Sequence, residues 1–159
     1  MTGLPVVRRP EWTEIRLDEN YRTTIEIVGG HILKSTPSGY ATVTGVGRLR
    51  SLHREAIAAA IKPGAPHVHI ADYTNFKGST FEARRAFADD LKTRDGLTAL
   101  IVHNTPPLFK LSIKLGRRFL GLKFPVEITA DYPSAIRRAC DILREAGVED
   151  PVEYETRGA

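Results

Sequence analysis

The chain has 159 residues, of which 42% are hydrophobic and 26% are charged, and this composition excludes a disordered chain and fits a globular domain with a sizeable core. Its 23 basic and 19 acidic side chains give a net charge of +4, too weak a bias to indicate a DNA-binding protein. A single cysteine excludes an internal disulfide. Because no signal peptide or membrane-spanning apolar run is visible, we expect a cytoplasmic protein.

The N-terminal part of the chain predicts an antiparallel pair of strands. Residues 1–11 are expected to form an irregular arm, and the alternating segments 12–17 and 23–28 then predict strands. Gly29-Gly30 separates the second strand from residues 31–34. Two adjacent glycines readily adopt the positive φ angles of a tight hairpin turn. The domain should therefore open with a hairpin.

The apolar spacing becomes helical after a breaker at residues 35–39. Leu49, Leu52, Ala56 and Ile57 recur at helical spacing, and Pro63-Gly64 ends that helix. The segments that follow alternate between strand and helix: strand 67–72, helix 79–95, strand 97–102, helix 105–120, strand 124–128 and helix 131–146.

This alternation determines the predicted fold class. Strands that are separated by single helices pair in parallel through right-handed crossovers. We therefore predict an α/β fold with a mixed sheet, in which the antiparallel N-terminal hairpin is followed by parallel strands joined by helices. One domain, residues 12–147, accounts for the pattern, and residues 148–159 are expected to form a polar C-terminal tail.

Three short motifs and the order of the elements carry a family resemblance. The motifs are Ala71-Asp72-Tyr73-Thr74, Gly78-Ser79-Thr80-Phe81-Glu82-Ala83-Arg84 and Asn104-Thr105-Pro106-Pro107-Leu108-Phe109-Lys110. Together they resemble the STAS domains of anti-sigma-factor antagonists and the STAS-like modules of bacterial signalling proteins. The resemblance implies a non-enzymatic regulatory or sensor module without a cofactor. Its partner would be a signalling protein, of the sensor kinase or sigma-regulator type, or a small ligand.

The resemblance also implies a phosphorylation site at the start of the second helix. In some members a Ser or Thr at this position is phosphorylated, and the matching positions are Ser79 and Thr80. The family typically has Asp-Ser-Ser or Asp-Ser-Thr here, whereas this chain has Lys77-Gly78-Ser79-Thr80. Ser79 with Glu82 three residues later also forms the pattern of a capping box, so we expect Ser79 to cap the helix.

Metal binding and catalysis have weaker support in the sequence. His67 and His69 share one face of a strand, but no third ligand follows at the right parity, so we predict no metal site and histidines that are solvated or hydrogen-bonded. Cys140 lies on the apolar face of a helix, where a thiol is usually inert, and Asp89-Asp90 indicate a solvated helix face. Because no catalytic motif occurs, we expect no catalytic residues and no enzyme activity.

The helix at residues 106–120 is the most unusual predicted surface. No acidic residue occurs from Gly96 to Val126, and Lys110, Lys114, Arg117 and Arg118 gather on one side of this helix. We predict a core-facing stripe and an extra apolar flank; the stripe comprises Leu108, Leu111, Leu115 and Phe119, and the flank comprises Phe109, Ile113 and Leu120.

The basic side and the apolar flank together predict a docking surface, although lysine stems that simply cover a wide core-facing helix explain the same pattern. An alternative function is therefore a peripheral lipid or anionic-ligand-binding domain that contacts anionic membranes through this helix. A homodimer also stays open. The predicted partner or ligand surface comprises Asp72, Tyr73, Thr74, Ser79, Thr80, Asn104, Phe109, Lys110, Lys114, Arg117 and Arg118.

Overall fold

The computed structural model describes residues 4–149, except for the side chains at positions 115 and 117–120. The strands are β1 (Val6–Val7), β2 (Ile15–Asp18), β3 (Tyr21–Thr23), β4 (Ile25–Val28), β5 (Ile32–Ser35), β6 (Ser38–Ala41), β7 (His67–Asp72), β8 (Phe76–Ser79), β9 (Leu97–His103) and β10 (Val126–Thr129). The helices are a 3₁₀ turn at Pro10–Trp12 and α1 (Val43–Ala60), α2 (Phe81–Thr93), α3 (Pro107–Leu120) and α4 (Tyr132–Glu145).

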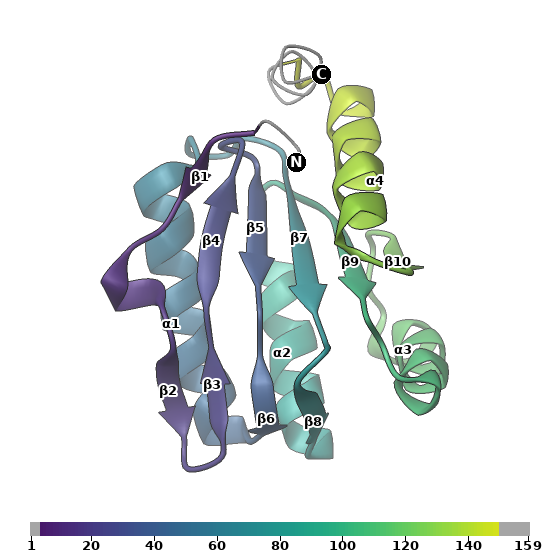
Figure 1. The fold of residues 1–159 in the computed structure, drawn as a ribbon. Coiled ribbons are helices and arrows are strands. Elements are labelled where there is room, and N and C mark those ends of the chain that lie inside the picture. Colours follow the sequence, from purple (N-terminus) through teal and green to yellow (C-terminus); the bar gives the residue numbers. More distant parts are fainter. Residues whose placement is uncertain (1–3, 150–159) are drawn as a thin grey trace.

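The strands form two sheets, and the smaller sheet lies at the end of the larger one in the direction of its strands. The larger sheet has the order β1-β4-β5-β7-β9-β10, and the smaller has the order β2-β3-β6-β8. In Figure 1, β3, β6 and β8 lie in line with β4, β5 and β7. The smaller sheet therefore extends the middle of the larger one towards the lower end of the view.

The predicted hairpin is confirmed. Strands β4 and β5 pair antiparallel, with Ile25 opposite Ser35 and Val28 opposite Ile32. Gly29 and Gly30 have φ angles of 62° and 70°, so both occupy the left-handed region that a tight hairpin turn requires.

The parallel half of the predicted sheet is also confirmed. Strand β7 pairs in parallel with both β5 and β9, and β9 pairs in parallel with β10. The carboxyl ends of β7 and β9 therefore meet at one edge, with Asp72 opposite His103. The fold is the mixed α/β arrangement that the sequence predicts.

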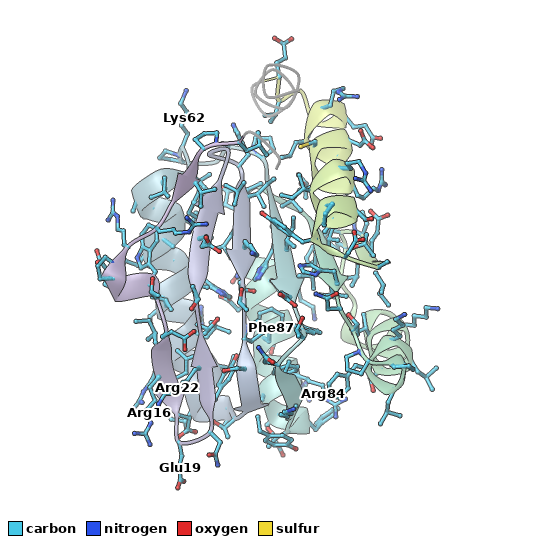
Figure 2. All side chains as sticks on the ribbon, viewed as in Figure 1. Arg16, Glu19, Arg22, Lys62, Arg84 and Phe87 are labelled. Carbon is cyan, nitrogen blue, oxygen red and sulfur yellow. The ribbon has the colours of Figure 1, made fainter. Side chains whose placement is uncertain are left out.

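Helices cover both faces of the larger sheet. Ala135, Ala139 and Leu143 of α4 pack on one face, against apolar side chains of β4, β5, β7 and β9. Leu52 and Ala56 of α1 pack on the opposite face, against Ile27 and Leu33. Figure 1 shows α1 and α2 together behind the sheet and α4 beside β9. Charged side chains such as Arg16, Glu19 and Lys62 project from the rim (Figure 2).

Several short segments differ from their predicted structure. Val6–Val7, expected in an irregular arm, pairs with β4, and Trp12, expected in a strand, ends the 3₁₀ turn. The breaker at 35–39 and the turn before α2 contain strands β6 and β8, which pair with each other in parallel. These strands are short and partly exposed, so their sequences lack an apolar alternation. The predicted tail lies outside the described residues from position 150 onward.

Gly39 allows β6 to approach the β2–β3 turn. Its φ angle is +83°, and a Cβ at this position would lie 1.8 Å from the backbone oxygen of Asn20. Only glycine fits this position without moving the backbone.

Among the described residues, no helix is both long enough and apolar enough to cross a bilayer.

Candidate functional site

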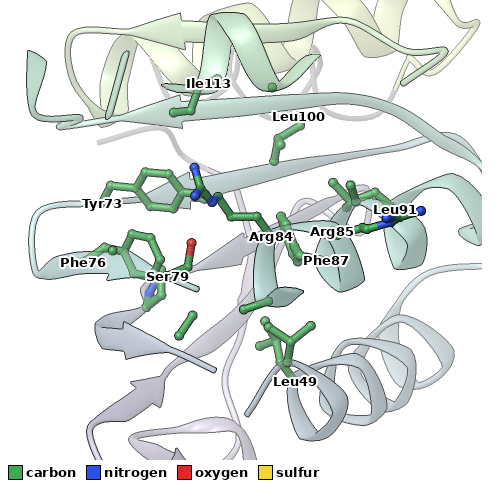
Figure 3. A pocket seen from close by; sticks show the side chains of 18 of the residues that line it. Leu49, Tyr73, Phe76, Ser79, Arg84, Arg85, Phe87, Leu91, Leu100 and Ile113 are labelled. Carbon is green, nitrogen blue, oxygen red and sulfur yellow. The ribbon is translucent and has the colours of Figure 1, made fainter. Parts of the chain in front are cut away.

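A cavity of about 980 Å³ lies on the sheet face that α1 and α2 cover, and it extends towards α3. Its apolar walls come from several elements: Leu49 from α1, Phe87 and Leu91 from α2, Leu100 from β9 and Ile113 from α3. Figure 3 shows these side chains directed towards a common space. A cavity of this size, mostly apolar with a few polar groups, is the usual form of a small-molecule site.

Three aromatic rings line the side of the cavity near β8. The Tyr73 and Phe76 rings stack with centroids 4.9 Å apart, and the Phe109 ring lies 6.0 Å from that of Phe76 (Figure 3 shows the first two). Burial raises the pKa of Tyr73 to about 12, so its hydroxyl stays neutral at physiological pH. Two predicted binding residues, Tyr73 and Phe109, are therefore brought together here.

Basic side chains surround this largely apolar space. Lys77, Arg84, Arg85 and Lys92 line the cavity, and the acidic lining residue is Asp89. Asp89 pairs with Lys92 at 3.7 Å. Lys77, Arg84 and Arg85 have no carboxylate partner among the described residues, so the local charge favours an anionic ligand.

A buried cluster of polar side chains adjoins the cavity and connects α1, α2, β5 and β7. The Arg94 guanidinium donates to the Nδ1 atoms of His69 at 2.9 Å and His53 at 3.0 Å, and to the Asp90 carboxylate at 3.2 Å. The Nε2 atom of His69 is 2.8 Å from the Ser35 hydroxyl. His53 and Ser35 line the cavity, so this cluster connects the cavity to a buried positive charge.

Asp90 corrects the prediction of a solvated Asp89-Asp90 pair. The Asp90 side chain is only 5% exposed and forms ion pairs with Arg94 at 3.2 Å, Arg50 at 3.3 Å and Arg54 at 4.0 Å. A buried carboxylate requires such partners, because desolvation of an unpaired charge is costly. The prediction holds for Asp89 and is wrong for Asp90.

Burial determines the charge state of the two cluster histidines. Desolvation lowers the pKa of His53 and of His69 well below 6.5, and the Arg94 charge lowers both further. Both imidazoles are therefore neutral at physiological pH. The hydrogen bond of His69 agrees with the prediction that His67 and His69 are solvated or hydrogen-bonded, but neither side chain is solvated, because both are fully buried.

The other predicted residues at the strand ends form a separate turn. Asp72 Oδ1 accepts hydrogen bonds from the Thr74 N–H at 2.9 Å, the Thr74 hydroxyl at 2.6 Å and the Asn104 amide at 3.3 Å. Burial raises the pKa of Asp72, but these hydrogen bonds outweigh it and hold the pKa below the usual range. Asn104 has a φ of +53° and lies at the end of β9. The turn orders this edge of the sheet next to Tyr73.

The start of α2 differs from the predicted capping box. Thr80 is the N-cap, because its hydroxyl accepts a hydrogen bond from the Ala83 N–H at 3.1 Å. Ser79 is the last residue of β8 and lines the cavity. The prediction that Ser79 caps the helix is therefore wrong by one residue, since β8 continues to Ser79. Phosphorylation of Ser79 or Thr80 stays a prediction.

Helix α3 presents a different face to the sheet than the sequence predicts. Leu108 and Leu111, expected in the core stripe, are 75% and 57% exposed. Phe109 and Ile113, expected as a docking flank, are half-buried and line the cavity. Both stripes of this helix are apolar, so the helical wheel alone cannot choose between them. Lys110 and Lys114 are exposed, and the side chains at 115 and 117–120, which include Arg117, Arg118 and Leu120, lie outside the described ones.

The remaining buried histidines are His67 and His103. Both ring nitrogens of His67 and of His103 lack a hydrogen-bond partner within the part of the chain that the structure describes, and His103 Nδ1 is 4.0 Å from Asp72 Oδ1. Within residues 4–149, no group of three His, Cys, Asp or Glu side chains could hold a metal ion.

Cys140 is buried in the α4 core, as its place on an apolar helix face predicts.

Sequence reasoning missed the polar end of the cavity. His53 occurs in an apolar helix pattern, where it looks like an ordinary core residue, and Arg94 follows the last turn of α2. The signal that could have found them is the polarity of His53 within an otherwise apolar stripe. Long-range packing brings Arg94 to it, which a pattern of neighbouring residues cannot show.

The fold and its similarity to a solved structure together define the class of this protein: the chain has a STAS-like fold. A solved structure from Shewanella loihica, described as an uncharacterized protein from the DUF3478 family with a SpoIIAA-like fold, matches with a TM-score of 0.53 and 18% sequence identity. The match covers 78% of this chain and 93% of that chain. No family model and no curated protein matches the sequence. The predicted STAS-like resemblance is therefore confirmed at the level of fold.

Proposed function

We propose that this chain is a non-catalytic STAS-like regulatory module that binds a small, largely apolar ligand and signals through a protein partner. The observation that supports the proposal is the cavity of about 980 Å³ lined by Leu49, Phe87, Leu100 and Ile113. Filling such a space with apolar surface is favourable, at roughly 25 cal/mol for each Å² removed from water. The partner would be a signalling protein of the sensor kinase or sigma-regulator type, as the STAS resemblance implies.

A neutral fluorescent probe tests ligand binding directly. N-phenyl-1-naphthylamine should bind saturably with one site per chain and gain fluorescence inside the cavity. Ser112 lines the cavity from α3, so Ser112→Trp should fill part of the space and weaken binding. Ser51 is exposed on α1, so Ser51→Trp is the matched control and should bind like wild type. Equal binding by Ser112→Trp and wild type would contradict the proposal.

Specific features of α3 favour a second candidate function, peripheral binding to anionic membranes. Leu108 and Leu111 are highly exposed, and Lys110 and Lys114 are exposed on the same helix. Exposed apolar side chains next to basic ones are typical of helices that lie at a lipid surface. The lysines would attract anionic headgroups, and the leucines would enter the interface.

Vesicle sedimentation tests this second candidate. The protein should bind phosphatidylglycerol vesicles more strongly than phosphatidylcholine vesicles, and added salt should weaken the binding. Lys110→Gln with Lys114→Gln should reduce binding, whereas Arg16→Gln with Lys62→Gln removes equal charge elsewhere and should not. Equal loss in both double variants would show a general charge effect and exclude α3 as the membrane surface.

A further inference from the structure

Unpaired hydrogen-bond donors occur in the buried lining of the cavity. The Nε2 atom of His53 and the hydroxyl of Thr23 are buried without a hydrogen-bond partner among the described residues. Each residue is only 1% exposed, and each lines the cavity. A buried polar group without a partner is costly and needs an explanation, such as an absent ligand.

The Arg94 bonds fix which histidine nitrogens carry a proton. A guanidinium only donates hydrogen bonds, so the Nδ1 atoms of His53 and His69 must both be acceptors. Each neutral ring therefore carries its proton on Nε2. The Nε2–H of His53 lies on the other side of the ring from Arg94 and is the unpartnered donor.

The Ser35 hydroxyl also has a proton that is free to donate to a ligand. The Nε2–H of His69 donates to the Ser35 hydroxyl oxygen at 2.8 Å, which leaves the Ser35 O–H able to donate to another group. The His53 and His69 ring centroids are 5.0 Å apart, so Ser35 and His53 both lie next to His69. Ser35 and Thr23 share one face of the sheet, because Ile25 lies opposite Ser35 and side chains alternate along a strand.

The charges near these donors favour an anion. Arg94 polarises both imidazoles, and the cluster holds Arg94, Arg50 and Arg54 against the single carboxylate of Asp90. A hydrogen bond to an ionised acceptor is roughly twice as strong as one between neutral groups. A carboxylate only accepts hydrogen bonds, and it can accept from several donors at once.

We propose that the cavity selects an apolar molecule that ends in a carboxylate, and that the His53 Nε2–H and the Thr23 and Ser35 hydroxyls donate hydrogen bonds to it. The apolar body of the ligand would lie against Leu49, which precedes His53 by one turn on the same face of α1 (Figure 3). This inference rests on the ligand-binding function proposed above and adds the chemical class of the ligand.

Calorimetry with decanoate and 1-decanol tests this selectivity, because the two probes share an alkyl chain and differ at the polar end. Wild type should bind decanoate about ten-fold or more tightly than 1-decanol, the size expected for a hydrogen bond to a charged group. In wild type, the NMR signal of the His53 Nε2–H should also shift on addition of decanoate.

Two variants have matched controls within the chain. Thr23→Val removes only an unpartnered hydroxyl, so it should fold and should weaken decanoate binding about three-fold or more while leaving 1-decanol binding unchanged. The Thr105 hydroxyl is also buried without a hydrogen-bond partner among the described residues, but Thr105 does not line the cavity, so Thr105→Val should leave both affinities unchanged. His53→Leu and His67→Leu form a second pair, in which only the first should weaken decanoate binding.

The outcomes separate this inference from the proposed function. Equal affinity for decanoate and 1-decanol, with no shift of the His53 signal, would overturn the carboxylate assignment and leave the apolar cavity as a ligand site. Failure of both probes and of N-phenyl-1-naphthylamine to bind would overturn the proposed function together with this inference. The wild-type measurements decide the question even if His53→Leu does not fold.

Discussion

Thr80 stabilises the start of α2 through one side-chain hydrogen bond. Its hydroxyl accepts from the Ala83 N–H at 3.1 Å, and this N–H has no acceptor within the helix. Thr80→Ala should therefore lower the free energy of unfolding by about 1 kcal/mol. Ser79→Ala is the matched control one residue earlier, and we expect it to change stability by less than about 0.5 kcal/mol. Urea unfolding of both variants measures the difference, and a larger loss for Ser79→Ala would assign the cap to Ser79.

Single residues were hardest to predict where their partners are distant in the sequence. Asp89 and Asp90 are adjacent and chemically equal, but Asp90 faces α1 and is surrounded by Arg50, Arg54 and Arg94. Two of these arginines lie on another helix. The pattern within α2 shows that a carboxylate is present on the helix; only the packing of α1 on α2 shows that it is buried.

Two glycines of α1 differ in the space around them, which gives a prediction at the level of the element. A Cβ at Gly45 would lie 2.4 Å from the Tyr21 ring, whereas a Cβ at Gly47 would have nothing within 4 Å. Alanine favours a helix over glycine by about 1 kcal/mol. Gly47→Ala should therefore raise the melting temperature, and Gly45→Ala should lower it because the Tyr21 ring must move. Thermal unfolding of both variants checks this, and stabilisation by Gly45→Ala would show that Tyr21 is free to shift.

The elements that the sequence predicted well are those with long, regular apolar patterns. Strands β7 and β9 are buried over most of their length, and α4 buries one face along its length, so their patterns follow directly from their packing. Strands β6 and β8 have four residues each, and pairing with neighbouring strands determines their structure more than their own composition. Helix α3 was predicted with the wrong face inward, because its apolar residues surround most of the helix.

The cavity belongs to the whole molecule and could not be predicted from any one segment. Its lining combines α1, α2, α3 and residues from both sheets, so its volume depends on how these elements pack. The STAS resemblance predicts a site at the turn at 72–80, and part of that turn does line the cavity. The buried donors on Thr23, Ser35 and His53 lie outside the motifs and required the three-dimensional arrangement.

Four buried histidines predict how the stability of the whole molecule depends on pH. Desolvation lowers the pKa of His53 and His69 well below 6.5, that of His67 to about 4, and that of His103 below its ordinary value. In the unfolded chain these groups titrate near 6.5, so below that pH the unfolded state binds protons that the folded state does not. Their contribution to stability is therefore complete above pH 6.5 and is lost progressively as the pH falls.

The expected loss follows from the linkage between proton binding and unfolding. Each histidine that stays neutral in the fold reduces the free energy of unfolding by about 1.4 kcal/mol for each pH unit below 6.5, so the free energy of unfolding should fall as the pH is lowered from 7 to 5. Asp18, Asp72 and Asp131, whose pKa values are lowered from 3.8, lose their contribution only below that value and leave this window unaffected. Urea unfolding at pH 7, 6 and 5 measures the slope. His67→Leu removes one of the four groups, so the change of the free energy of unfolding with pH should become smaller by the contribution of about one bound proton. A free energy of unfolding that stays constant from pH 7 to pH 5 would show that the buried histidines take up protons in the folded state.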